Sequence, residues 1–220
     1  MRTLRILLCV PALALWMTSA AQRQVEDAND EWLFSYKEAT AKPVKGIPPQ
    51  AQVAYDDTGW KSVSVPHTWQ TYETTRELHP YIRNVAASDN PYWWNGWGWY
   101  RKRIDIGREY AGRRIRVEFD GVQKYAKIYL NGKYLGDHKG GFTSFYVDAT
   151  DAVNFGGANI LAVAVQNSLD DKYRIPPMNA GNWAVYGGIV RDVRLVVSSP
   201  LERAQETALP AGHAASSVLF

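Results

Sequence analysis

The stretch RIRVEFDGVQKYAKIYLNGKYL, residues 114–135, decides the fold class. Its first part, Arg114 to Phe119, alternates polar and apolar side chains with a period of two, which is typical of a half-buried β-strand. In its second part, two apolar runs, Tyr125 to Leu130 and Tyr134-Leu135, flank Asn131-Gly132-Lys133. Because Asn and Gly tolerate the positive φ of a type I′ turn, this part is predicted to form a β-hairpin.

The rest of the chain repeats this pattern on both sides of the hairpin. From Trp32 to Leu195, short alternating runs are separated by Gly, Pro, Asn and Asp, and Ile160 to Val165 and Val193 to Val197 are further apolar strands. Convincing helical periodicity is absent from the sequence. Several short strands separated by turn signals predict an all-β sandwich or jelly roll rather than a fold built from βαβ units.

The composition is that of a globular protein with many aromatic residues. Of 220 residues, 46% are hydrophobic and 21% are charged, and a domain of this size buries about 70% of the surface that its unfolded chain exposes. Nine tryptophans and thirteen tyrosines favour strands and binding surfaces, although most aromatic side chains in such a chain belong to the core.

The N-terminus is typical of a secretory signal peptide. Arg2 and Arg5 form a short basic region, Ile6 to Met17 is apolar, and Ser19-Ala20-Ala21 resembles a cleavage site. The apolar run is shorter than the about 20 residues that a membrane span needs. We therefore expect residues 1–21 to be a signal peptide and the mature protein to be periplasmic or extracellular.

Removal of such a peptide changes what the chain can bind. The formal charge falls from +3 to +1, because Arg2 and Arg5 leave without any acidic residue. Binding to nucleic acid or to an anionic membrane surface then lacks its usual basic footprint. Cys9, the single cysteine, leaves as well, so no disulfide or thiol chemistry is expected in the mature chain.

Two long segments interrupt the regular strand spacing. Residues 70–97 end in the aromatic cluster Tyr92 to Trp97, and residues 167–186 contain Asp170-Asp171 and Trp183. Segments of this length inside a compact domain are usually functional or disordered, and their aromatic content argues against disorder.

The tryptophans around the first of these segments allow two interpretations. Aromatic faces stack on the apolar face of a pyranose, while Asn and Asp side chains bind its hydroxyl groups. Alternatively, these side chains close one end of the sandwich core. The tryptophans concerned are Trp93, Trp94, Trp97 and Trp99.

The usual catalytic and metal-binding patterns are missing from the sequence. His67, His79, His138 and His213 lack the spacing of a zinc site, and His67 is interpreted as a packed, hydrogen-bonded histidine. No nucleophile elbow, P-loop or dinucleotide fingerprint is found, so no cofactor is expected. Glycoside hydrolysis needs two carboxyl groups across a sugar, but Asp170-Asp171 is more typical of a solvated turn.

Seven motifs recur in order over residues 30–197 and together resemble the sugar-binding domain of glycoside hydrolase family 2, the β-galactosidase/β-glucuronidase type. This resemblance implies a galactose-binding-like jelly-roll β-sandwich, which we expect to span residues 22–200. The motifs are Val65-Pro66-His67-Thr68-Trp69, Gly98-Trp99-Tyr100-Arg101-Lys102, Phe119-Asp120-Gly121-Val122, Tyr129-Leu130-Asn131-Gly132-Lys133 with Gly140-Gly141-Phe142-Thr143, Tyr186-Gly187-Gly188-Ile189, and Arg191-Asp192-Val193.

The resemblance also implies that the catalytic groups lie elsewhere. In the family this domain precedes an immunoglobulin-like domain and a (β/α)₈ barrel that carries the acid/base and nucleophile glutamates. A barrel needs about 250 residues, so we expect this chain to be inactive alone and to have the barrel as its partner. Residues 201–220 depart from the family, and we expect a disordered tail from a truncated or frameshifted gene. A free-standing carbohydrate-binding module and a purely structural domain are the alternatives.

In galactosidases of the family, this domain lends polar residues to the sugar site of the barrel. The position of an acidic family residue matches Asn182, and that departure weakens hydroxyl binding and any cation site there. The position of a family asparagine matches Asn95. The expected substrate-binding residues are Asn95, Trp97, Asp170, Asn182 and Trp183, with weak affinity for carbohydrate and no metal. We also expect an exposed apolar patch among Trp93, Trp94, Trp97 and Trp183.

Overall fold

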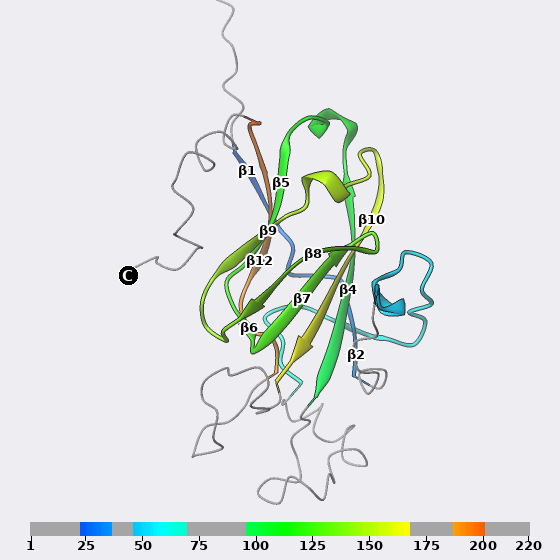
Figure 1. The fold of residues 1–220 in the computed structure, drawn as a ribbon, viewed down its shortest axis with the longest axis vertical. Helices are drawn as coiled ribbons and strands as arrows, with labels where there is room; N and C mark the ends of the chain where they lie inside the picture. The colour runs from blue at the N-terminus through cyan, green and yellow to red at the C-terminus, as the bar shows by residue number, and fades with distance from the viewer. Residues whose placement is uncertain (1–22, 37–45, 70–95, 168–186, 201–220) are drawn as a thin grey trace, which may run out of the picture.

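The computed structural model describes residues 23–36, 46–69, 96–167 and 187–200, which form two antiparallel β-sheets packed face to face (Figure 1). Apart from strands, the described residues contain three single 3₁₀ turns: η1 (Pro49–Ala51), η2 (Arg108–Tyr110) and η3 (Thr150–Ala152). None of them has the length or apolar character of a membrane span. The prediction of an all-β jelly-roll sandwich is confirmed.

The smaller main sheet has four strands in the order β1-β12-β5-β9. They are β1 (Gln24–Asp27), β12 (Val193–Ser198), β5 (Arg114–Phe119) and β9 (Phe145–Asp148). The larger sheet has six strands in the order β3-β2-β4-β10-β7-β8. They are β3 (Lys61–Val63), β2 (Trp32–Ser35), β4 (Trp97–Ile106), β10 (Gly157–Gln166), β7 (Tyr125–Leu130) and β8 (Lys133–Lys139). A short pair, β6 (Val122–Gln123) and β11 (Gly188–Ile189), closes one end.

The main core lies between the two sheets. Ile115, Val117 and Phe119 of β5 face it and are no more than 1% exposed, as the alternation of that strand predicts. The arginines of β5 are also buried, on the opposite face of the sheet. Arg116 lies over the ring of Tyr146, with its guanidinium carbon 4.7 Å from the ring centroid. The strand is therefore covered on both faces, and not half-buried as its sequence suggests.

A second apolar cluster covers the outer face of the six-stranded sheet. Its aromatic members are Trp60, Trp97, Trp99, Tyr125 and Tyr129, which pack around Ala51, Ala162 and Ala164. The segment from η1 to Trp60 forms part of this cover and is held by Arg101 of β4. The Arg101 guanidinium donates to Asp57 Oδ2 at 2.7 Å and to the Gln52 carbonyl oxygen at 3.0 Å.

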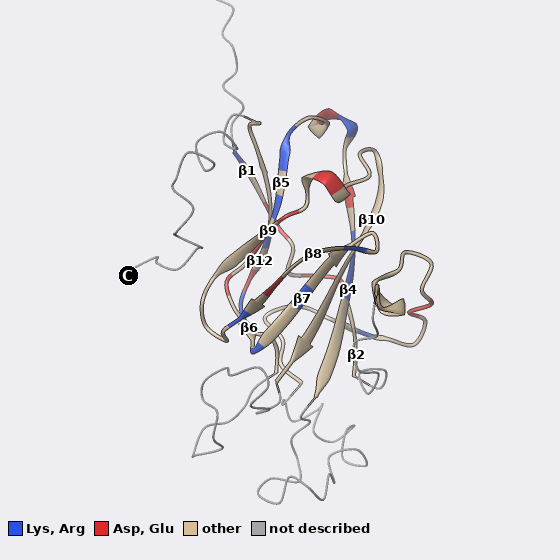
Figure 2. Cartoon of the chain, viewed as in Figure 1, with Lys and Arg blue, Asp and Glu red and all other residues tan. Residues whose placement is uncertain are grey.

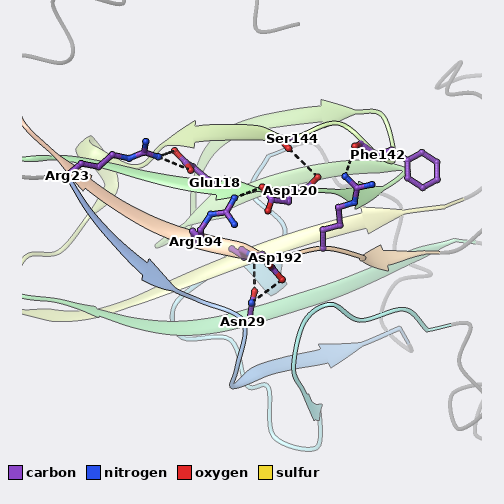
Figure 3. A network of polar contacts seen from close by, with 10 residues as sticks. Arg23, Asn29, Glu118, Asp120, Phe142, Ser144, Asp192 and Arg194 are labelled. Atoms are coloured by element: carbon purple, nitrogen blue, oxygen red, sulfur yellow. Dashed lines mark hydrogen bonds and ion pairs between the residues drawn. The ribbon is translucent and has the colours of Figure 1, made fainter. Parts of the chain in front are cut away.

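A polar network joins the residues that flank β1 to the neighbouring strands of the four-stranded sheet (Figure 3). Arg23 pairs with Glu118 at 3.1 Å, and Arg194 pairs with Asp120. Asn29 accepts from the Val193 backbone N–H at 2.8 Å and donates to Asp192 at 3.3 Å. Exposed ion pairs of this kind contribute about 0–1 kcal/mol each, so the network mainly fixes where the chain enters the sheet.

The predicted hairpin is present as β7 and β8. Leu130 pairs with Lys133, and both turn residues have positive φ, 51° at Asn131 and 80° at Gly132, which is the type I′ geometry. The Asn131 amide also donates to Asn159 Oδ1 at 2.7 Å and accepts from the Ile160 N–H at 2.9 Å. The turn residue thus joins the hairpin to β10.

Replacing Gly132 by Val should lower the free energy of unfolding by about 1–2 kcal/mol, because a β-branched residue resists a left-handed backbone. A Cβ atom there would also lie 3.1 Å from Gln52 Oε1. Gly132→Asn is the matched control, since Asn tolerates this conformation. Urea unfolding measures both, and equal stability of the two variants would contradict the turn assignment.

Candidate functional site

The two long segments begin and end at the same end of the sandwich, the lower one in Figure 1. The backbone N–H of Trp69 donates to the Gly187 carbonyl oxygen at 3.2 Å. Gly96 and Asn167 are joined twice: the Asn167 N–H donates to the Gly96 carbonyl oxygen at 3.3 Å, and the Gly96 N–H donates to Asn167 Oδ1 at 2.9 Å. The first residue before each segment is therefore bonded to the first residue after the other.

Trp69 is the packing centre of this end. Its indole is 1% exposed and stacks on Phe34, with the ring centroids 5.7 Å apart and the planes at 12°. A Cβ atom on Gly98 would lie 2.8 Å from Trp69 Cζ3, and one on Gly187 would lie 1.9 Å from Trp69 Cζ2. Only glycine fits at these two positions without displacing the indole.

His67 and Tyr100 form a hydrogen-bonded pair beside this indole. His67 Nδ1 lies 2.7 Å from the Tyr100 hydroxyl oxygen. The backbone N–H of His67 donates to the Ile189 carbonyl oxygen at 2.7 Å. Gly188 has φ 138°, and a Cβ atom there would lie 2.3 Å from the His67 carbonyl oxygen. The glycines of the 187–188 motif therefore let this strand approach both aromatic residues closely.

The electrostatics of the pair favour uncharged groups. Burial, and then the positive charge of Lys61, lowers the pKa of His67 to about 4, and burial raises the pKa of the Tyr100 hydroxyl above its ordinary range. A neutral phenol donates its O–H, so Nδ1 of a neutral imidazole is the acceptor. His67 is thus a packed, hydrogen-bonded histidine, as its sequence context indicates.

Two further glycine-containing motifs, Phe119–Val122 and Gly140–Thr143, meet beside this group. The Val190 N–H donates to the Gly121 carbonyl oxygen at 3.1 Å, and a Cβ atom on Gly141 would lie 1.4 Å from Gln123 Oε1. Arg191 Nη1 donates to the Phe142 carbonyl oxygen at 3.3 Å (Figure 3). Motifs that are far apart in the sequence therefore build one end of the sandwich, where the lower ends of β4 and β10 carry no charged residue (Figure 2).

Of the expected substrate-binding residues, the structure describes only Trp97. Asn95, Asp170, Asn182 and Trp183 lie outside the described residues, as do Trp93 and Trp94. Trp97 is 8% exposed and packs edge-on against Tyr125, with the ring centroids 5.9 Å apart. The expectation that Trp97 contributes to an exposed apolar patch is wrong, because the second apolar cluster encloses it.

Two buried polar residues at this end were not singled out from the sequence. Gln123 and Lys124 are 3% and 1% exposed, and burial lowers the pKa of the Lys124 ammonium group. The backbone N–H of Lys124 donates to the carbonyl oxygen of Gln166, the residue before Asn167, at 2.9 Å. Their signal in the sequence is a pair of polar residues between two apolar strand runs. Within the described ranges, no three His, Cys, Asp or Glu side chains form a metal-binding group.

Gly187→Ala should lower the free energy of unfolding by about 1–3 kcal/mol, because overpacking forces a buried side chain from its position. Gly157→Ala is the control, since its nearest neighbours would lie 4.0 Å away, and it should be close to neutral. Both values come from urea unfolding. Equal stability of the two variants would show that the Trp69 indole shifts freely.

His67 should make the fold less stable in acid. Because its folded pKa of about 4 lies below the unfolded value, its contribution is present above about pH 6.5 and is lost as the pH falls towards 4, up to about 3 kcal/mol. His67→Asn keeps an acceptor for the Tyr100 hydroxyl but does not titrate. The stability difference between wild type and variant should therefore shrink over this interval. Parallel pH–stability curves would contradict the assigned protonation.

Comparison with known proteins identifies the family. The model for the sugar-binding domain of glycosyl hydrolases family 2 matches residues 25–199. A β-glucuronidase of Formosa agariphila is 34% identical over 188 residues, which are 83% of this chain and 18% of the relative. A β-galactosidase of Thermoanaerobacter pseudethanolicus is 31% identical over 180 residues, which are 80% of this chain and 21% of the relative.

The solved structures agree with the sequences. The crystal structure of a Bacteroides uniformis β-glucuronidase superimposes with a TM-score of 0.63 at 34% identity, over 81% of this chain and 18% of that one. The chain thus spans about a fifth of the length of the relatives that it matches. Because this family model covers most of an all-β sandwich, the protein belongs to glycoside hydrolase family 2, of which it represents the N-terminal sugar-binding domain.

Proposed function

We propose that this chain is the non-catalytic N-terminal module of a secreted β-glycosidase, and that residues 70–95 and 168–186 contribute to the substrate site of the catalytic part. The observation that carries this proposal is the pairing of the ends of the two segments through Trp69, Gly187, Gly96 and Asn167. Residues 70 and 168, at which the two segments start, are far apart in the sequence. The residues that flank the segments are nevertheless bonded to one another at one end of the sandwich.

The residues at which the two segments leave the sandwich, Trp69, Gly96, Asn167 and Gly187, are held by packed and hydrogen-bonded neighbours. Trp69 fills the space left by two glycines, and His67 and Tyr100 form a buried, uncharged hydrogen bond next to it. A binding group is most effective when packed and hydrogen-bonded neighbours hold its support in place. In the sequence, Asn95 directly precedes Gly96, and Asn182 and Trp183 precede Gly187 by five and four residues.

The chemical step is assigned to the rest of the enzyme. Hydrolysis of a glycoside requires two carboxyl groups placed on either side of the scissile bond, and the family resemblance implies that both glutamates belong to the barrel. The two relatives compared above, a β-glucuronidase and a β-galactosidase, are about four to five times as long as this chain. The predicted signal peptide at residues 1–21 supports export of the enzyme.

A chimaeric enzyme tests the proposal. Residues 25–199 replace the corresponding domain of the Bacteroides uniformis β-glucuronidase, while the isolated chain serves as the inactive reference on aryl β-glucuronides and β-galactosides. We expect the chimaera to hydrolyse aryl β-glucuronides. Asn182→Ala and Trp183→Ala should each lower its kcat/KM about tenfold, the effect of losing one contact to the substrate.

Tyr146→Ala is the matched control in the chimaera, because Tyr146 lies on the four-stranded sheet and is 41% exposed. It should leave kcat/KM unchanged. If a folded, active chimaera is indifferent to both segment variants, the segments do not serve the substrate site. Turnover by the isolated chain that is the same in every preparation would instead contradict the non-catalytic assignment.

A further inference from the structure

The outer face of β7 and β8 carries a group of accessible polar and aromatic side chains that the sugar-binding end does not use. A bulge in β8 creates the group. Tyr134 pairs with Tyr129, whereas Gly136 pairs with Ile128, so that Leu135 is the extra residue. In a regular strand Tyr134 and Asp137 would face opposite sides of the sheet; the bulge places both on the outer face. Bulges frequently re-aim side chains next to binding sites.

The Asp137 carboxylate is oriented by a phenol. The Tyr125 hydroxyl donates to Asp137 Oδ2 at 2.7 Å. Burial, followed by the negative charge of Asp137, raises the pKa of Tyr134 to about 12, so the exposed phenol beside it stays protonated and uncharged. A carboxylate has about four acceptor sites, and a single donor leaves the others for ligand hydroxyl groups.

The aromatic part of the group is firmly supported. Tyr134 is 48% exposed and Tyr129 is 4% exposed, with their ring centroids 5.5 Å apart. Tyr129 in turn packs on Trp99, with a centroid distance of 6.1 Å. The Tyr134 ring is therefore an accessible surface with a rigid aromatic layer beneath it.

Two ammonium groups complete the arrangement. Lys127 Nζ and Lys139 Nζ lie 5.9 Å and 5.8 Å from the centroid of the Tyr125 ring. In the described part of the chain, neither lysine forms an ion pair with Asp137 or another carboxylate. The group therefore has two positive charges and one negative charge, which favours an anionic ligand that also has hydroxyl groups.

We propose that this face binds a uronic-acid-containing glycan, with a sugar ring on Tyr134, its hydroxyl groups at Asp137 and its carboxylate at Lys127 and Lys139. A neutral sugar would use the ring and the carboxylate of the protein but leave both ammonium groups without a counter-charge. The proposal does not depend on the function proposed above, because every group in it belongs to the described sandwich.

The isolated chain can be titrated with two matched probes, the β-1,4-linked tetramer of glucuronic acid and that of glucose, which differ in the carboxylate at C6. Calorimetry at low salt should give a Kd of roughly millimolar for the acidic tetramer and binding about fivefold weaker for the neutral one. Added salt should weaken binding of the acidic tetramer alone, because screening acts on exposed charges.

Variants test the residues. Tyr134→Ala and the pair Lys127→Gln with Lys139→Gln should each weaken binding of the acidic tetramer about fivefold or more. Tyr146→Ala and Lys133→Gln are the controls, since Tyr146 is an exposed tyrosine of the other sheet and Lys133 donates to the Asp151 carbonyl oxygen. Absence of binding, equal affinity for both tetramers, or wild-type affinity in variants that melt normally would each overturn the proposal.

Discussion

The Trp69 indole occupies a space that exists only because Gly98 and Gly187 have no Cβ atom. This contact joins three parts of the chain that are distant in sequence: the start of one long segment, the second residue of β4 and the end of the other long segment. Because a packed interior transmits a change of one methyl group to its neighbours, the positions of Trp69 and Gly187, which flank the two segments, depend on this contact. The hydrogen bond from Trp69 to Gly187 then fixes their separation at the backbone.

His67 and Tyr100 extend the same constraint without adding charge. Had the imidazole been protonated, a buried positive charge would lie beside an apolar indole, at a cost of several kcal/mol. The Tyr100 hydroxyl avoids this cost by donating to a neutral Nδ1. The His67–Tyr100 pair therefore adds directional bonding beside the Trp69 indole without adding a buried charge.

The bounds of several strands were predictable from the sequence, but what covers their faces was not. β5 and β7 begin and end where the alternating run Arg114 to Phe119 and the apolar run Tyr125 to Leu130 do, although β5 is covered on both faces. The Asn131-Gly132 turn follows from local backbone preferences alone. β4 has no such pattern, because Tyr100 faces the core while Trp97 and Trp99 face the second apolar cluster. The burial of Trp97 depends on Tyr125, which joins it only through sheet pairing.

The same sheet pairing explains why the group on β7 and β8 has no signature in the sequence. Tyr134 and Asp137 are three residues apart, a spacing that indicates opposite faces in a regular strand, and the bulge that reverses this is visible only in the pairing with β7. The tyrosines on the outer face of the six-stranded sheet therefore have two different environments. Tyr125 and Tyr129 are buried in the second apolar cluster. Tyr134, which the bulge places on the same face, packs on Tyr129 and is exposed, so its ring is the accessible part of the proposed binding surface.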